Sequence, residues 1–316
     1  MPRYLSAPMQ VHYNIEQLPP FKNAVITIGT FDGVHRGHAT IIDALVTEAS
    51  RIEGESIIVT FHPHPRKIIQ PHTSLHLINT LDEKIELLQQ TGISHLVIIP
   101  FTDAFAELTA EDYIERLLVH YFQPHTIIIG YDHHFGKGRL GNITLLQQLQ
   151  SRWNYKLIEI PKHLLEEISV SSTQIRMALG SGNISVANKL LGYSFFFEGK
   201  VVTGDRIGRT LGFPTANLVY TDSDKIHLGE GVYAVFVSID GQKRGGMLSI
   251  GKRPTLNDVE ERVEVNIFDF DGDLYGSVIR VWVEAFLRAQ EKYTSLEELT
   301  QQIRIDKQQA MLSLNV

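Results

Sequence analysis

The chain has 316 residues, of which 43% are hydrophobic and 21% are charged, a composition typical of a globular protein with about two domains. Its net charge of −7 argues against a nucleic-acid or membrane-surface partner, since either would favour a basic face. The absence of cysteine excludes disulfides, thiol catalysis and cysteine-ligated metals, and it agrees with a cytoplasmic location. Because we find neither the apolar core of a signal peptide nor a run of the ~20 apolar residues that span a bilayer, we expect no membrane partner.

The first half of the chain alternates short apolar runs with amphipathic segments. One amphipathic segment begins at Thr80, which forms the pattern of a capping box with Glu83, and it is closed by Gly92. Near-continuous apolar strands that are separated by helices predict a parallel sheet covered on both faces. We expect the strands at residues 24–29, 56–61, 95–101, 126–130 and 155–160.

After about Gly182 the pattern changes to strands without intervening helices, which predicts an antiparallel sheet or small barrel. Asp240-Gly241 and Asp271-Gly272 are predicted to be hairpin turns. A final helix is expected to begin at Ser295, capped with Glu298. The expected strands are 195–204, 231–239, 245–251, 263–270 and 274–287, and the two domains should comprise residues 1–183 and 184–316.

The glycine-rich stretch GTFDGVHRGH follows the first predicted strand, at the edge of the sheet where parallel α/β folds bind ligands. Gly29, Gly33 and Gly37 allow a sharp turn and a close approach of the backbone to a ligand. His35 and His38 are three residues apart and therefore share a face where the next helix begins. A helix N-terminus favours anions, and two imidazoles beside it can donate hydrogen bonds to phosphate oxygens. The stretch therefore predicts a phosphate site.

Two other interpretations of this stretch stay open on the residues alone. One is a plain glycine-rich turn with Asp32 as a cap and two surface histidines. The other is a metal site, which is less favoured because a histidine pair normally needs a third ligand that the local sequence lacks. A Walker A loop is excluded, since it would require a lysine followed by serine or threonine after the glycines.

The motifs of the whole chain resemble the prokaryotic FAD synthetase family. GTFDGVHRGH is similar to the nucleotidylyltransferase signature in the form used by bacterial FAD synthetases, and FHPHPRKI, GYDHHFGKGRLGN and VSSTQIR match further stretches of that family. The second half resembles riboflavin kinase through GKVVTGDRIGRTLGFPTANL, GVYAV, SIGKRPT, VEVNIFDFDGDLYG and FLRAQEKY. The resemblance implies a Rossmann-like FMN adenylyltransferase domain with a parallel sheet, followed by a small antiparallel β-barrel riboflavin kinase domain that ends in a helix.

In the adenylyltransferase reaction that the resemblance implies, the phosphate of FMN attacks the α-phosphorus of ATP and pyrophosphate leaves. This chemistry needs placement and charge stabilisation rather than a protein nucleophile. The family pattern would place His35, His38 and Arg176 on the phosphates, with Asp132 as a polar residue of the active site. Without the resemblance, Arg176 would be a solvated helix residue in a segment that starts with a plain N-cap. The other residues expected to bind the nucleotide are Gly29, Phe31, Asp32, Gly33, Gly37, Ser171, Ser172 and Thr173.

In the kinase reaction, the γ-phosphate of ATP passes to the ribityl hydroxyl of riboflavin, and Mg²⁺ with a backbone cradle carries most of the catalysis. Thr215 and Asn217 have oxygens suited to Mg²⁺, to which the family pattern assigns them. Glu264 matches the position of the general base. On sequence alone, the PTAN segment would be a turn and Glu264 an outward strand residue. The residues expected to bind nucleotide or flavin are Gly204, Gly208, Arg209, Gly212, Pro214 and Arg288.

Three positions depart from the family pattern: His133 replaces an aromatic residue, Ser249 an asparagine and Gln290 a glutamate. We expect these departures to affect affinity rather than activity. Two other functions are considered, namely a nucleotidylyltransferase for another phosphorylated substrate with a C-terminal flavin-binding module, and a flavin-binding regulator that has lost catalysis. The expected partners are the small molecules ATP, riboflavin and FMN, and a homo-oligomer is compatible with the sequence.

Overall fold

The computed structural model describes residues 8–161, 170–204, 208, 211–254 and 259–316, and the chain divides into two compact units. One unit comprises the residues up to Leu75 together with Asn79–Ser171, and the other comprises His76–Ile78 together with Ser172–Val316. The domain boundary that the change of pattern predicts between residues 183 and 184 stays a prediction.

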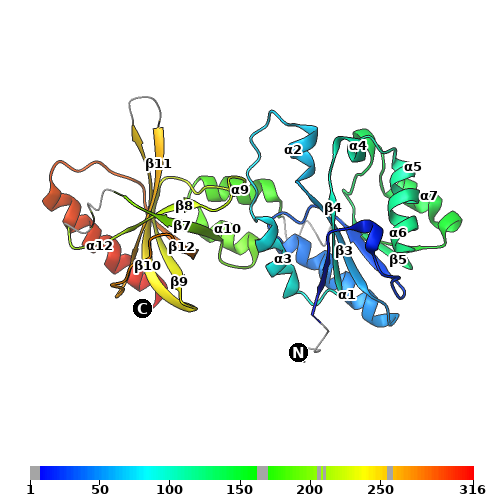
Figure 1. Cartoon of the computed structure of the whole chain (residues 1–316), viewed down its shortest axis with the longest axis horizontal. Helices are drawn as coiled ribbons and strands as arrows, with labels where there is room; N and C mark the ends of the chain where they lie inside the picture. Colours follow the sequence, from blue (N-terminus) through cyan, green and yellow to red (C-terminus); the bar gives the residue numbers. More distant parts are fainter. Residues whose placement is uncertain (1–7, 162–169, 205–207, 209–210, 255–258) are drawn as a thin grey trace. The chain divides into compact units, whose positions relative to one another are not determined.

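The first unit contains a six-stranded sheet in which every pair of neighbouring strands is parallel (Figure 1). The strand order is β1-β4-β3-β2-β5-β6. Five strands coincide with the expected apolar runs, whereas β1 was not expected, because three residues are too few to show a pattern. The strands are β1 (Gln10–His12), β2 (Val25–Ile28), β3 (Ser56–His62), β4 (His95–Pro100), β5 (Thr126–Gly130) and β6 (Lys156–Ile160).

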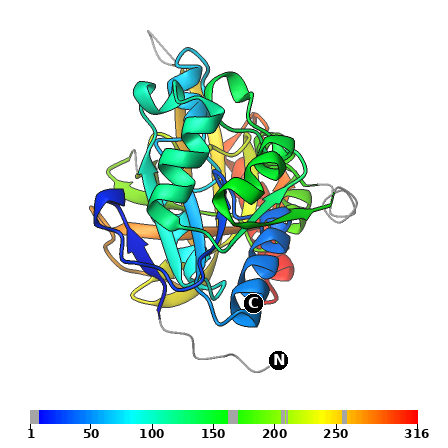
Figure 2. The ribbon, with the colours of Figure 1, turned by 90° about the vertical axis from the view of Figure 1, so that its right-hand side faces the viewer.

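Both faces of this sheet are covered by helices, as its apolar strands predict (Figure 2). Ile26 and Ile127 face a core cluster with the segment 110–122, while Val25 and Ile128 face the opposite cluster with α1. The capping box of Thr80 and Glu83 is confirmed, with both of its hydrogen bonds present. The helical elements are η1 (Ile15–Gln17), α1 (Arg36–Arg51), α2 (Pro65–Ile69), α3 (Leu81–Gln89), α4 (Asp103–Ala106), α5 (Ala110–Asp112), η2 (Tyr113–Val119), α6 (His120–Phe122), η3 (Lys137–Arg139) and α7 (Ile143–Trp153).

The strand order reverses direction between β2 and β5, because β3 and β4 lie on one side of β2 and β5 and β6 on the other. Ligands of open parallel sheets bind at such a reversal, outside the carboxyl ends of the strands. The segment that follows β2 is GTFDGVHRGH, and the segment that follows β5 begins YDHH. The topology therefore brings two of the sequence motifs to one crevice.

The second unit is a closed antiparallel barrel with the order β10-β11-β8-β7-β12-β9. The C-terminal helix α12 packs on the barrel through Ala310 and Leu314, and Ser295 caps it as expected. The elements are α9 (Ser172–Gly180), α10 (Ile184–Leu191), β7 (Phe196–Val202), β8 (Ala216–Tyr220), β9 (Gly231–Ile239), β10 (Gln242–Pro254), β11 (Val259–Ile267), β12 (Val278–Arg288) and α12 (Leu296–Leu314).

Of the two predicted hairpin turns, one is confirmed and one is wrong. Asp240 and Gly241 both have positive φ, as a tight hairpin requires, and they join β9 to β10. Asp271-Gly272 does not close a hairpin, because β11 pairs with β8 and β10 whereas β12 pairs with β7 and β9. Closure of the barrel places β12 between β7 and β9, so the segment between β11 and β12 is a crossover.

A buried carboxylate joins α1 to the edge strand β6 of the first unit. Glu48 is 7% exposed and accepts hydrogen bonds from Arg51 Nε at 2.7 Å and from Lys156 Nζ at 2.9 Å. The bonds from Arg51, followed by those from Lys156, outweigh burial and lower the pKa of Glu48 to about 2. The carboxylate therefore stabilises the fold only while it is ionised.

We predict that Glu48→Gln lowers the free energy of unfolding by about 1–2 kcal/mol at pH 7. The full pKa shift corresponds to ~3 kcal/mol, and solvent screening of the half-exposed cations reduces this value. Because the folded pKa lies below the ordinary value of 4.5, the parent loses this contribution as the pH falls from 4.5 toward 2. Urea unfolding at pH 7 and pH 3 should therefore show a smaller difference at pH 3. Glu53→Gln, at an exposed ion pair, is the matched control and should change stability little.

Candidate active sites

The turn after β2 has an unusual backbone that buried polar groups hold in place. Phe31, Gly33 and Val34 all have positive φ, which non-glycine residues adopt only when their surroundings enforce it. The carbonyl oxygen of Thr30 accepts hydrogen bonds from Lys84 Nζ at 2.7 Å and from Thr60 Oγ1 at 3.2 Å. Lys84 is 6% exposed, and no feature of the sequence distinguished it from an ordinary helix residue. Its ammonium group therefore fixes the turn through the carbonyl oxygen of Thr30.

His35 and His38 begin helix α1 as a stacked pair. His35 is the N-cap, and its Nδ1 accepts a hydrogen bond from the backbone N–H of His38 at 3.3 Å. The two rings are stacked with their centroids 3.7 Å apart, and the ring of Phe31 lies 5.0 Å from that of His38. A Cβ on Gly37 would lie 3.2 Å from His35 Nδ1, so glycine leaves room for the cap. The interpretation with Asp32 as the cap is therefore wrong, since His35 caps the helix.

The surroundings of the two imidazoles determine which of their ring nitrogens carry protons. Because Nδ1 of His35 accepts a hydrogen bond, its proton in the neutral form lies on Nε2. Burial, followed by the neighbouring His35 and Lys84, lowers the pKa of His38 well below its ordinary value. Nδ1 of His38 is buried without a hydrogen-bond partner among the described residues. A helix N-terminus with two imidazoles beside it is suited to a phosphate ligand.

Asp32 is part of the support of this turn. It is 2% exposed, its Oδ1 accepts a hydrogen bond from the backbone N–H of Asn79 at 3.4 Å, and its charge opposes the burial that lowers the pKa of Lys84. The Asp32–Lys84 pair thus neutralises the buried charge below the turn.

The segment after β5 begins at the same edge of the sheet as the turn after β2. Asp132 is exposed directly after β5, and its carbonyl oxygen is 2.9 Å from His134 Nδ1. His133 stacks on Phe135, which in turn stacks on Tyr113. Burial lowers the pKa of His133 to about 4, so the ring is neutral at pH 7. The family pattern has an aromatic residue at this position, and the neutral ring of His133 packs here as an aromatic ring would.

The VSSTQIR motif begins helix α9 in the second compact unit. Ser172 and Thr173 form its first turn, and Ser171 is the last residue of the first unit. Nε of Arg176 donates a hydrogen bond to the carbonyl oxygen of His76 at 2.8 Å. Participation of these residues in the phosphate site after β2 stays a prediction.

On the barrel, strand register brings Asn217 and Glu264 together. They are direct cross-strand partners of β8 and β11, so their side chains lie on the same face. Their neighbours Leu218, Val263 and Val265 are buried in the barrel interior, which places Asn217 and Glu264 on its outer face. Arg262 Nη1 lies 3.7 Å from Glu264 Oε1 on that face.

Glycines of the preceding loop make room for the oxygens of this face. A Cβ on Gly204 would lie only 2.1 Å from Asn217 Nδ2, and one on Gly208 would lie 3.1 Å from Thr215 Oγ1. The hydroxyl of Thr215, the amide oxygen of Asn217 and the carboxylate of Glu264 form a set of hard oxygen donors. These residues fit Mg²⁺, and glycine is required at 204 for the amide to occupy this position. Arg209 lies outside the described residues.

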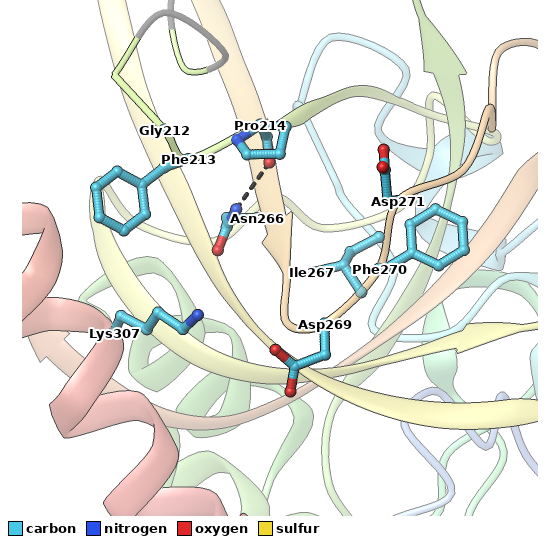
Figure 3. Close-up of a pocket in the computed structure, with 9 residues that line it drawn as sticks. All are labelled: Gly212, Phe213, Pro214, Asn266, Ile267, Asp269, Phe270, Asp271 and Lys307. Carbon is cyan, nitrogen blue, oxygen red and sulfur yellow. Dashed lines mark hydrogen bonds between the residues drawn. The ribbon is translucent and has the colours of Figure 1, made fainter.

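A pocket of about 300 Å³ lies beside this face, between the loop before β8, the segment after β11 and helix α12 (Figure 3). Asn266 Nδ2 donates a hydrogen bond to the carbonyl oxygen of Pro214 at 2.7 Å, and the side chain of Lys307 extends from α12 toward Asn266 and Asp269. The sequence predicted only two of the lining residues, Gly212 and Pro214. The lining residues are Gly212, Phe213, Pro214, Asn266, Ile267, Asp269, Phe270, Asp271 and Lys307.

Arg288 is engaged in an ion pair that anchors α12. Its Nε and Nη2 donate to the two carboxylate oxygens of Asp306 at 2.8 and 2.7 Å, and Asp306 is 2% exposed. This bidentate geometry raises the pKa of Arg288. A role of Arg288 in ligand binding stays a prediction.

In the part of the chain that the structure describes, no group of three or more histidine, cysteine, aspartate or glutamate side chains is arranged to hold a metal ion. No described helix is long and apolar enough to cross a membrane.

Comparison with known proteins identifies both halves. Residues 19–174 match the family model of FAD synthetase, and residues 191–314 match that of riboflavin kinase. The chain is 34% identical over 296 residues to the bifunctional riboflavin kinase/FMN adenylyltransferase of Escherichia coli K12, covering 93% of this chain and 94% of that protein. It is also 34% identical over 293 residues to the enzyme of the same name from Bacillus subtilis, covering 91% and 92%.

The fold is matched by a crystal structure from Streptococcus pneumoniae that is described as a macrolide-efflux protein. The TM-score is 0.86 at 31% sequence identity, and the match covers 96% of this chain and 98% of that one. The expected combination of a parallel sheet with an antiparallel barrel is thereby confirmed. The two family models match successive parts of the chain, and the relatives match it along almost its whole length. The chain therefore belongs to the bifunctional riboflavin kinase/FMN adenylyltransferase family.

Proposed function

We propose that this chain phosphorylates riboflavin to FMN with ATP and then adenylylates FMN to FAD, each at its own site. The observation that carries the proposal is that the two motif sets form two differently built sites. One is the helix start with stacked histidines at the carboxyl ends of β2 and β5, and the other is the Asn217–Glu264 pair on the barrel. A cytoplasmic location is also proposed, and the absence of cysteine supports it.

At the first site, an oxygen of the FMN phosphate attacks the α-phosphorus of ATP, the bond to the bridging oxygen breaks, and pyrophosphate leaves. His35 donates through Nε2–H, and His38 binds beside it at the N-terminus of α1, where negative charge is favourable. The pairing of the buried Lys84 with the turn carbonyl keeps this geometry fixed. Arg176, Ser171, Ser172, Thr173 and Asp132 are proposed to complete the site on the strength of their motif positions.

At the second site, Glu264 accepts the proton of the ribityl hydroxyl. The hydroxyl oxygen of the ribityl chain attacks the γ-phosphorus of ATP, and ADP leaves. Thr215 and Asn217 would hold Mg²⁺, which supplies positive charge to the phosphate oxygens when it is bound. The fit of these residues rests on their oxygen donors and on the space that Gly204 leaves beside Asn217.

We further propose that the pocket beside Pro214 holds the nucleotide of the kinase reaction. Its lining includes Pro214, the residue that precedes Thr215 in the chain. Lys307 adds a cation to this lining, which also includes the rings of Phe213 and Phe270. A pocket with apolar rings and a few polar groups suits a base and its phosphates.

We predict that substitutions at the two sites affect the two activities separately. His38→Ala should slow FAD formation by roughly 10²-fold, as expected for the loss of a donor to developing charge, while riboflavin phosphorylation continues and FMN accumulates. Glu264→Gln should slow riboflavin phosphorylation by roughly 10²–10⁴-fold, while added FMN is still adenylylated. Chromatographic separation of riboflavin, FMN and FAD measures both reactions. Loss of both reactions from either single substitution in a folded protein would contradict one site per activity.

A second prediction concerns metal binding. Gly204→Ala should displace the side chain of Asn217, raise the Mg²⁺ concentration needed for half-maximal kinase activity and lower the maximal rate by roughly 10²-fold. Gly180→Ala is the matched control, because a Cβ there meets nothing within 4 Å. An unchanged Mg²⁺ dependence in Gly204→Ala would exclude Asn217 from the metal site.

The third prediction tests the nucleotide pocket. Lys307→Met keeps most of the side-chain volume but removes the charge, so the KM for ATP in riboflavin phosphorylation should rise roughly tenfold, as for a lost charged hydrogen bond. The KM for ATP in FMN adenylylation serves as the internal control and should not change. If both KM values rise, or neither does, the pocket is not the nucleotide site of the kinase.

A further inference from the structure

Two of the three departures from the family pattern, Ser249 and Gln290, contact each other. Gln290 Nε2 lies 2.9 Å from Ser249 Oγ, 3.0 Å from the carbonyl oxygen of Ile250 and 3.3 Å from that of Gly231. Carbonyl oxygens only accept hydrogen bonds, so the atom that faces both of them must be the amide nitrogen. Although Gln290 is exposed, these acceptors determine the orientation of its amide.

This orientation determines the direction of the Ser249 hydroxyl. An amide N–H donates, so Ser249 Oγ is the acceptor and its own hydrogen points elsewhere. The register of β10 and β11 places Ser249 directly opposite Glu264 on the same face, where Cβ atoms of such pairs are about 4.5–5.5 Å apart. Leu248 and Ile250, on either side of Ser249, are buried inside the barrel. Ser249 and Glu264 are thus neighbours on the outer face, and rotation of their side chains can bring the hydroxyl hydrogen to the carboxylate.

The Glu264 carboxylate thus has neighbours of known chemistry on three strands. Asn217 lies opposite it on β8, Ser249 lies opposite it on β10, and Arg262 Nη1 is 3.7 Å from its Oε1 on β11. A carboxylate that is held by fixed donors presents its remaining oxygen lone pairs in one direction, which favours a single approach of the substrate hydroxyl.

We propose that Ser249 is a positioning residue for riboflavin phosphorylation, whose hydroxyl donates to the Glu264 carboxylate in a direction set by Gln290. This inference rests on the proposed function, because it takes Glu264 as the base. A glutamate at position 290 would only accept hydrogen bonds, so it would capture the hydroxyl hydrogen of Ser249. Serine at 249 and glutamine at 290 are therefore a matched pair.

The first test removes and restores the hydroxyl. Ser249→Ala should lower the kcat of riboflavin phosphorylation by roughly 10- to 100-fold, as for a lost hydrogen bond to a charged group, with little change in the KM for riboflavin or ATP. Ser249→Thr, which keeps the hydroxyl, should retain most of the rate. In a Glu264→Gln background, Ser249→Ala should have little further effect.

The second test reverses the direction of the hydroxyl. Gln290→Glu should lower kcat nearly as much as Ser249→Ala, and it should add little to Ser249→Ala in the double variant. Gln290→Met also loses the amide bonds but cannot capture the hydrogen, so it should lower kcat less than Gln290→Glu. Thermal unfolding and FMN adenylylation by the same proteins check that each variant is folded.

The inference would be overturned by an unchanged kcat in Ser249→Ala, by equal losses in Gln290→Met and Gln290→Glu, or by fully additive effects of Ser249→Ala and Gln290→Glu. A loss that appears only in KM would also contradict a positioning role. If Glu264→Gln retains kinase activity, the proposed base itself is wrong. If Glu264→Gln loses activity but Ser249→Ala does not, only the role of Ser249 fails.

Discussion

The pairing of strands places the chemistry-bearing side chains of both units. In the parallel sheet, the reversal of strand order between β2 and β5 brings the ends of two distant motifs to one crevice. In the barrel, antiparallel register sets Asn217, Glu264 and Ser249 in one row across three strands. A shift of that register by one residue would turn Glu264 into the core. The same backbone hydrogen bonds that stabilise the fold therefore also position the groups that we propose to react.

The two sites use buried charge differently. At the start of α1, the buried Lys84 donates a hydrogen bond to the carbonyl oxygen of Thr30 and interacts electrostatically with Asp32. The pKa of the adjacent His38 is lowered by burial and by its charged neighbours. On the barrel, Glu264 lies in a half-buried row of polar side chains near Arg262. Phosphate recognition at one site and proton removal at the other are consistent with this difference.

Local features could be predicted from the sequence, whereas partners distant in the chain could not. The apolar runs and the capping box at Thr80 depend on nearby residues, and the structure confirms them. The partner of a strand depends on closure of the whole barrel, which explains why Asp271-Gly272 was wrongly assigned to a hairpin. Lys84, Lys307 and the contact between Ser249 and Gln290 carried no local signal, because each acquires its role only when distant elements pack together.

The central claim, that two complete and separate sites act in sequence through free FMN, is tested most directly by mixing two inactivated proteins. Neither His38→Ala nor Glu264→Gln alone should convert riboflavin efficiently to FAD. An equimolar mixture with riboflavin, ATP and Mg²⁺ should form FAD after a lag in which FMN accumulates, because the intact kinase of one protein supplies the intact adenylyltransferase of the other. The account would be contradicted if FMN accumulates in the mixture and is not converted to FAD, although the Glu264→Gln protein still adenylylates added FMN.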